Sequence, residues 1–268
     1  MALGLPIVQP VLLNGDAAIP LIDLRPDALV WAAYGNLIPR KLIDAVEGRA
    51  VNVHASLLPR WRGAAPIAHA ILAGDRVTGV ALMQGTASLD RGPVIASAPT
   101  GIEHAESAGP LTARLAELGG ALLERELMAF VAGRTRAIAQ DEAAATWAPK
   151  LTTADGELRF SESAEALERR VRAMTPDPGA WTRFRGQRLV IERASVAGGR
   201  GVAHGTFEIR DGAPHVAAGA GWLRLDAVKP AGKRAMTGAD WARGIRRSRD
   251  RSDLGDLGDL GAEPRLPS

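Results

Sequence analysis

The feature that most constrains the fold is a continuous apolar run at 29–33, which is bounded by turn-forming residues and followed by a helical segment and a second strand. A run of this kind, without polar alternation, is typical of a strand buried on both faces of a parallel sheet. Segment 37–46 carries apolar residues at helical spacing between Pro39 and Gly48, and 50–53 is the next strand. Strand, helix and strand in this order predict a doubly wound α/β domain, whose ligands bind beyond the carboxyl ends of the strands.

The rest of the first half repeats the alternation of helix and strand. We expect helices at 66–74 and 111–131, and strands at 78–84 and 94–98. The 111–131 helix has one long apolar face of leucines and a phenylalanine, which indicates that it packs against the core.

Asn52 and His54 lie two residues apart along a short strand, so their side chains point to the same face. An amide N–H can bind a carbonyl oxygen that gains negative charge, while an imidazole handles a proton. Asp90, in the loop after the 78–84 strand, is a candidate for the carboxylate that orients the imidazole. These three residues are therefore candidate catalytic groups for acyl transfer. The alternative is that they are ordinary polar residues at a strand end and in a turn.

A longer pattern around these residues resembles that of a known family. Asn52-Val53-His54 is followed by Ser56-Leu57-Leu58-Pro59 and then by the run PRWRGAAP, which starts at Pro59. This pattern resembles the signature of the folate-dependent formyltransferases, and its PRWRGAAP form is most similar to that of the methionyl-tRNA formyltransferases. The resemblance continues through segments 33–39, 148–150, 176–181 and 229–233, and so spans roughly residues 3–247.

The resemblance implies roles for individual residues. Asn52 would bind the formyl oxygen, His54 would stabilise the oxyanion and take part in proton transfer, and Asp90 would hold His54. The formyl donor would be 10-formyltetrahydrofolate, a co-substrate, and the acceptor the α-amine of initiator methionyl-tRNA. The segments that match the folate-binding part of the family contain Tyr34, Gly35, Leu37, Ile38, Pro39, Ser56, Leu57, Leu58 and Pro59. Further substrate contacts are expected at Arg60, Arg62 and Lys150, although the two arginines suit ion pairs that brace their loop equally well.

The second half of the chain differs from the first in charge and in periodicity. Residues 151–247 hold 17 Lys and Arg against 11 Asp and Glu, a balance of +6, whereas residues 1–150 hold 13 against 14, a balance of −1. Such a surplus is the electrostatic footprint of a module that tracks phosphates, although an arginine-rich coding bias would look the same. A helix at 163–173 is followed by short strands that indicate a small barrel, at 188–194, 205–209, 214–217 and 222–228.

These patterns predict a Rossmann-like, doubly wound parallel sheet followed by a small β-barrel, which the resemblance identifies as of the oligonucleotide-binding type. The expected parts are a formyltransferase domain at 1–138, a linker at 139–156, a tRNA-contacting barrel at 157–247 and a disordered tail at 248–268. By the family pattern the sheet is expected to be incomplete at its N-terminus. About sixty residues, including the first strand of the doubly wound domain, would precede the point where this chain begins.

Composition excludes several classes of protein and of site. The chain has no cysteine, so disulfides, thiolate metal sites and a thiol nucleophile are excluded, and its five histidines have no metal-ligand spacing. It also has no apolar run of about eighteen residues and no secretory signal. We therefore expect a cytoplasmic monomer without bound metal or membrane contact. Two other functions stay open, a sugar-nucleotide formyltransferase and a catalytically inert chain that retains only a tRNA-binding module.

Overall fold

The computed structural model describes residues 16–249 apart from Asn36 and Ala87, together with residues 4, 7, 9 and 13. The chain forms two compact units. Unit 1 comprises 1–66, 77–101 and 114–149, and unit 2 comprises 67–76, 102–113 and 150–268. The part of the expected tail beyond Arg249 lies outside the described residues.

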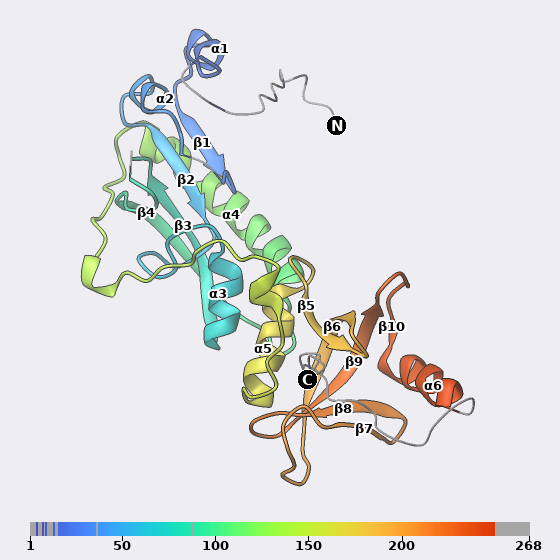
Figure 1. Ribbon diagram of the computed structural model, residues 1–268. Helices are drawn as coiled ribbons and strands as arrows, with labels where there is room; N and C mark the ends of the chain where they lie inside the picture. The colour runs from blue at the N-terminus through green and yellow to red at the C-terminus, as the bar shows by residue number, and fades with distance from the viewer. Residues whose placement is uncertain are drawn as a thin grey trace, which may run out of the picture. The chain divides into compact units, whose positions relative to one another are not determined.

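Unit 1 is built on a four-stranded sheet in the order β1-β2-β3-β4 (Figure 1). The strands are β1 (Leu29–Ala32), β2 (Ala50–His54), β3 (Val77–Gln84) and β4 (Val94–Gly101). All four lie where the sequence predicts strands, which confirms the Rossmann-like α/β class. β1 is less buried than its apolar composition suggests, and its residues alternate between half-buried and exposed. The reason is that β1 is at the edge of the described sheet and pairs there with β2 alone.

The sheet is mixed, whereas the sequence predicted a parallel one. β1 pairs with β2 in parallel, but β2 with β3 and β3 with β4 are antiparallel. The connection between β3 and β4 is residues 85–93, which is too short for the crossover of about a dozen residues that parallel pairing requires. The parallel prediction was therefore wrong for β3 and β4.

Four helices alternate with or flank these strands in the chain, and two of them fall partly in unit 2. They are α1 (Ile19–Asp23), α2 (Arg40–Asp44), α3 (Pro66–Ala73) and α4 (Ala108–Val131). α2 packs its buried Ile43 in a small cluster with Val46, Ala50 and Trp31. α4 approaches the sheet so closely at Gly119 that an added Cβ would lie 3.0 Å from Val53 Cγ1. Val53 points away from the face of β2 that carries Asn52 and His54, so α4 covers the opposite face of the sheet.

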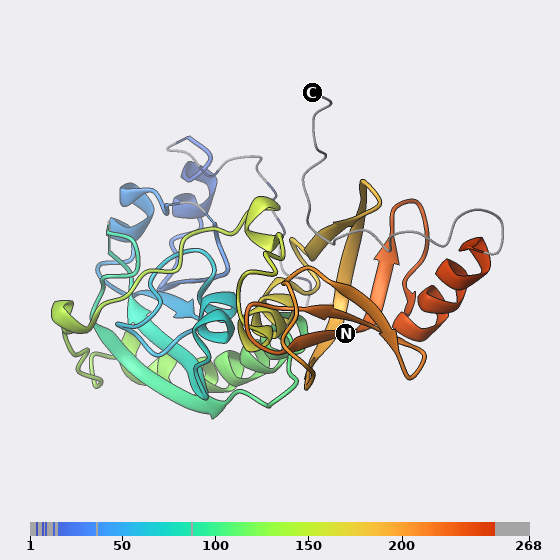
Figure 2. The ribbon, with the colours of Figure 1, turned by 60° about the horizontal axis from the view of Figure 1, so that its bottom comes forward.

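Unit 2 contains a six-stranded antiparallel sheet in the order β5-β6-β9-β8-β7, with β10 paired to β9 (Figure 1). Figure 2 shows these strands from another side, in gold to orange. The strands are β5 (Ala180–Phe184), β6 (Gln187–Ala197), β7 (Phe207–Arg210), β8 (Ala213–Ala217), β9 (Trp222–Pro230) and β10 (Met236–Thr237). Four of these were predicted, and β5 and β10 were not. The sheet gives the small barrel-like domain that the sequence predicts.

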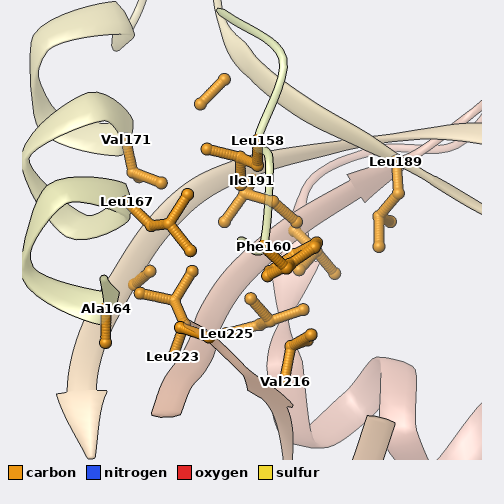
Figure 3. Packing of buried hydrophobic residues seen from close by; sticks show 14 of the residues in the cluster. Leu158, Phe160, Ala164, Leu167, Val171, Leu189, Ile191, Val216, Leu223 and Leu225 are labelled. Carbon is orange, nitrogen blue, oxygen red and sulfur yellow. The ribbon is translucent and has the colours of Figure 1, made fainter. Parts of the chain in front are cut away.

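Helix α5 (Ala164–Met174) packs its apolar side onto this sheet (Figure 3). Ser163 caps the helix, because its side chain accepts a hydrogen bond of 3.2 Å from Ala166 N. Leu167 and Val171 lie one turn apart and are both buried among Ile191, Leu223 and other residues of the sheet. This cluster is the hydrophobic core of unit 2.

The last described helix is α6 (Gly238–Arg249), which packs beside β8 and β9 (Figure 1). Its Trp241 ring lies 4.9 Å from the Phe184 ring and 5.8 Å from the Phe207 ring, measured between centroids. Edge-to-face contacts of this kind stabilise a core beyond simple burial. The sequence-based description ended the barrel at Arg247 without predicting this helix. In the described part of the chain, no helix is long and apolar enough to span a membrane.

Candidate functional site

β2 places Asn52 and His54 on one face of the unit 1 sheet. Both side chains are nearly buried, with 7% and 6% of their surface exposed. The strand forms here because its flanking valines are apolar and β-branched, which suits a buried pleated strand. The alternation expected from the sequence therefore brings an amide and an imidazole side by side in a place with little water.

Asp90 joins these two groups, although it lies 36 residues beyond His54 in the chain. Asn52 Nδ2 donates a hydrogen bond of 3.1 Å to Asp90 Oδ1, and His54 Nδ1 lies 3.7 Å from the same oxygen. Because β3 is antiparallel to β2, the loop after β3 must fold back over the face of β2 to reach these residues. All three candidate catalytic residues thus meet at one buried carboxylate oxygen.

The second oxygen of Asp90 and the second nitrogen of His54 are held by the PRWRGAAP loop. Gly63 N donates a hydrogen bond of 2.9 Å to Asp90 Oδ2. His54 Nε2 lies 2.9 Å from the Trp61 carbonyl oxygen, which can only accept, so Nε2 carries a proton. His54 Nδ1 is then the nitrogen that faces Asp90, and a proton bound there would lie between the imidazole and the carboxylate.

The backbone around the site adopts conformations that few residues tolerate. Trp61 and Asp90 have φ values of 61° and 51°, in the left-handed region. Gly63 has φ of 119°, and a Cβ there would lie 2.6 Å from the Ala148 carbonyl oxygen, so this position requires glycine. Strained residues of this kind persist where surrounding contacts hold them, and they cluster at functional sites.

Arg62 lies behind the site and is fully buried. Its guanidinium donates to Gln140 Oε1 at 3.0 and 2.8 Å and to the two Glu142 carboxylate oxygens at 3.0 and 2.8 Å. The hydrogen bond from Arg62 lowers the pKa of the Glu142 carboxyl below its ordinary value. Arg62 therefore braces its loop, the alternative that the sequence left open, and its charge is not presented to a substrate.

The other predicted contact residues lie at the edge of the sheet where β1 and β2 end, at Arg60, and at Lys150. Segment 33–39 follows β1 and segment 55–59 follows β2, and the parallel pairing of these strands puts both segments at the same edge of the sheet. Ser56 is fully buried and donates 2.6 Å to the Arg60 carbonyl oxygen, while the Arg60 guanidinium lies 4.4 Å from the centroid of the Trp61 ring. Lys150 is exposed at the start of the last stretch of unit 2.

Comparison with known proteins agrees with this geometry. The formyl transferase family model matches residues 13–127, and the model of the formyl transferase C-terminal domain matches residues 150–246. The chain is a member of the formyl transferase family. Methionyl-tRNA formyltransferase of Halorhodospira halophila is 43% identical over 246 residues, 91% of this chain and 79% of that protein. The enzyme of the same name from Rhodococcus erythropolis is 38% identical over 244 residues, with the same coverage.

Comparison with solved structures extends the likeness to the fold. HypX from Aquifex aeolicus, crystallised in complex with tetrahydrofolic acid, matches with a TM-score of 0.64 and 18% identity. The match covers 85% of this chain and 41% of HypX. At this identity the likeness concerns the fold. Within the described part of the chain, no cluster of three or more His, Asp or Glu side chains is arranged to hold a metal ion.

Sequence reasoning missed three groups that contact the candidate residues: the Trp61 carbonyl, the Gly63 N–H and the Gln140 side chain. The first two are backbone groups, which every residue carries, so no residue-type pattern marks them. A signal for Gly63 was present, because a glycine within the PRWRGAAP run suggests a close backbone approach. Gln140 lies between the two family matches, in the segment assigned to a linker, and nothing in its surroundings marked it.

Proposed function

We propose that this chain transfers the formyl group of 10-formyltetrahydrofolate to the α-amino group of initiator methionyl-tRNA. The observation that carries the proposal is the convergence of Asn52, His54 and Asp90 on one buried carboxylate oxygen. The names of the similar full-length relatives support the choice of acceptor, since the chain covers 79% of their length.

The chemistry follows from what each group can still offer a substrate. One hydrogen of the Asn52 amide binds Asp90, which leaves the other to bind the formyl oxygen. The methionyl amine attacks the formyl carbon, and the oxygen becomes an oxyanion that the Asn52 N–H and the His54 imidazole stabilise. The new C–N bond forms, the bond from the formyl carbon to folate breaks, and one proton moves from the amine to the folate nitrogen. His54 and Asp90 are the groups placed to relay that proton.

The folate donor would bind at the edge where β1 and β2 end. Two segments meet there, 33–39 and 55–59. Leu37 is 64% exposed, which provides an apolar surface for an aromatic ring system. The residues proposed to contact the donor are Tyr34, Gly35, Leu37, Ile38, Pro39, Ser56, Leu57, Leu58 and Pro59.

Unit 2 would contact the acceptor RNA through the hairpin of β5 and β6. Its Arg183, Arg185 and Arg188 are exposed, and the turn at Arg185-Gly186 has φ values of 49° and 75°. The Arg188 and Arg183 guanidinium carbons lie 4.8 and 5.9 Å from the Trp181 ring centroid. Arginines stacked on an aromatic ring offer both charge and a flat surface to a nucleic acid. Lys150 and Arg60 are further proposed contacts, and we propose that the protein acts as a cytoplasmic monomer.

A competition between acceptors tests this proposal. Purified protein is incubated with 10-formyltetrahydrofolate and with either Met-tRNA or an amino-sugar nucleotide, and formyl transfer is measured with each. We expect formylmethionine on the tRNA and no formylated sugar. Transfer to the sugar alone would show that the acceptor is an amino-sugar nucleotide and not Met-tRNA. Binding of tRNA without transfer to either acceptor would show that the chain acts only as an RNA-binding module.

A further inference from the structure

A single amide side chain connects the segment between the two family matches to the loop that carries Asp90. Gln140 Nε2 donates 2.9 Å to the Asp90 carbonyl oxygen and 2.7 Å to the Gly92 carbonyl oxygen. Its Oε1 accepts both hydrogen bonds that Arg62 directs to it. We propose that Gln140 is a positioning residue, which orients the Asp90 carboxylate by fixing the backbone on both sides of Arg91. The proposal deepens the proposed function and rests on it for its catalytic consequence.

The position requires an amide because it needs a donor and an acceptor on one planar group. A glutamate would still accept from Arg62 but would turn a carboxylate oxygen toward two carbonyl oxygens. A methionine fills a similar volume but offers neither a donor nor a strong acceptor. Both substitutions would release the two carbonyl groups while leaving the local volume almost unchanged.

Gln140 is itself fixed in place by a buried charge. Arg62 has no exposed surface, and Glu142 binds it through both carboxylate oxygens. The same segment is tied to β4 by two backbone hydrogen bonds of 2.8 Å between Ile138 and Val94. It is also tied to the PRWRGAAP loop by the bonds Ala148 N to Arg62 O, 2.7 Å, and Arg62 N to Thr146 O, 2.9 Å. The amide therefore works from a rigid support.

The backbone of Asp90 needs such a support. Its φ of 51° lies in the left-handed region, which residues other than glycine seldom adopt. Held there, the side chain directs one oxygen at Asn52 and the other at Gly63 N. Without the two bonds from Gln140, the loop can relax toward a common conformation and the carboxylate turns away. We expect the hydrogen bond from Gly63 N to Asp90 Oδ2 to be lost first.

The test compares the full-length wild-type chain with Gln140→Met, Gln140→Glu and the neighbouring control Asp141→Asn. Asp141 is exposed and its side chain accepts a hydrogen bond from Ala143 N, which asparagine can keep. Amide hydrogen exchange at Gly63, measured by NMR without any substrate, reports whether Gly63 N still donates to the Asp90 carboxylate. Transfer kinetics with separate kcat and KM values report the consequence for catalysis.

We expect both Gln140 variants to fold and to exchange the Gly63 amide at least about 10-fold faster, with Asp141→Asn unchanged. Their kcat should fall about 10- to 100-fold while KM for each substrate stays within about threefold. Unchanged exchange at Gly63, a rise in KM alone, or loss of folding in both variants would overturn the proposal. If the wild-type chain transfers no formyl group, the proposed function fails, and the exchange measurement still decides the role of Gln140.

Discussion

At the scale of single residues, the site depends on a carboxylate whose two oxygens have different partners. Asp90 Oδ1 faces Asn52 and His54, and Oδ2 accepts from Gly63 N. Strand periodicity was enough to predict that Asn52 and His54 share a face. The proximity of Asp90 was not predictable from periodicity, because it depends on how a loop folds back. Its place in the loop after the 78–84 strand made it a candidate, and the family resemblance supported that choice.

A buried histidine outside the site, His215 of β8, leads to a prediction about stability. Burial lowers the pKa of His215 below its ordinary value, and its Nδ1 lies 3.0 Å from the Ala213 carbonyl oxygen. The unfolded chain therefore takes up a proton at His215 as pH falls through about 6.5, while the folded chain resists protonation until lower pH. As the pH is lowered between these two pKa values, the free energy of unfolding should decrease by at most about 1.4 kcal/mol per pH unit.

Urea unfolding of three full-length chains checks this prediction. We expect the urea concentration at the midpoint to decrease for the wild-type chain when the pH is lowered from about 7.5 to about 5.5. His215→Gln should make this decrease smaller. His204→Gln changes an exposed histidine of the same unit and should leave the fall as it is. Equal pH dependence in all three chains would show that His215 does not contribute.

At the scale of helices and strands, the sequence predicted most elements but not the antiparallel pairings of β3, and it missed β5, β10 and α6. The strand β10 has only two residues, too few for an alternation. α6 had a detectable signal in the pattern Thr237-x-x-Asp240, and in the structure Thr237 Oγ1 accepts from Asp240 N as an N-cap does and donates to Asp240 Oδ2. That Thr-x-x-Asp pattern precedes Trp241 and Ile245, which are both buried.

Two adjacent glycines in α4 give a prediction at this scale. A Cβ at Gly120 would meet nothing within 4 Å, whereas one at Gly119 would lie 3.0 Å from Val53 Cγ1 and 3.4 Å from Val80 Cγ1. Gly120→Ala should raise the free energy of unfolding by about 0.5–1 kcal/mol, because alanine loses less backbone entropy in a helix. In Gly119→Ala the crowding against β2 should cancel or reverse that gain. Thermal unfolding of both variants decides, and equal stabilisation by both would contradict the close packing of α4 on the sheet.

At the scale of the whole molecule, the segment between the two family matches is the part that sequence reasoning described least well. Residues 139–149 show no apolar periodicity, so they were assigned to a linker, yet they belong to unit 1 and contact both loops of the site. Their contacts are backbone bridges and polar side-chain bonds, which periodicity cannot register. The family matches had the same gap, since they end at 127 and resume at 150.

The most direct test of the proposed chemistry is the single-turnover rate of formyl transfer to Met-tRNA by Asp90→Asn. Asparagine tolerates the left-handed backbone of Asp90, but it removes the charge beside His54 and turns an NH₂ group toward Asn52 or Gly63 N. We predict a rate lower by about 10²–10³ with the affinity for the folate donor unchanged within about twofold. Asp211→Asn is the matched control, an exposed aspartate with φ of 49°, and should keep the wild-type rate. A near-normal rate for Asp90→Asn would contradict a catalytic role for the site.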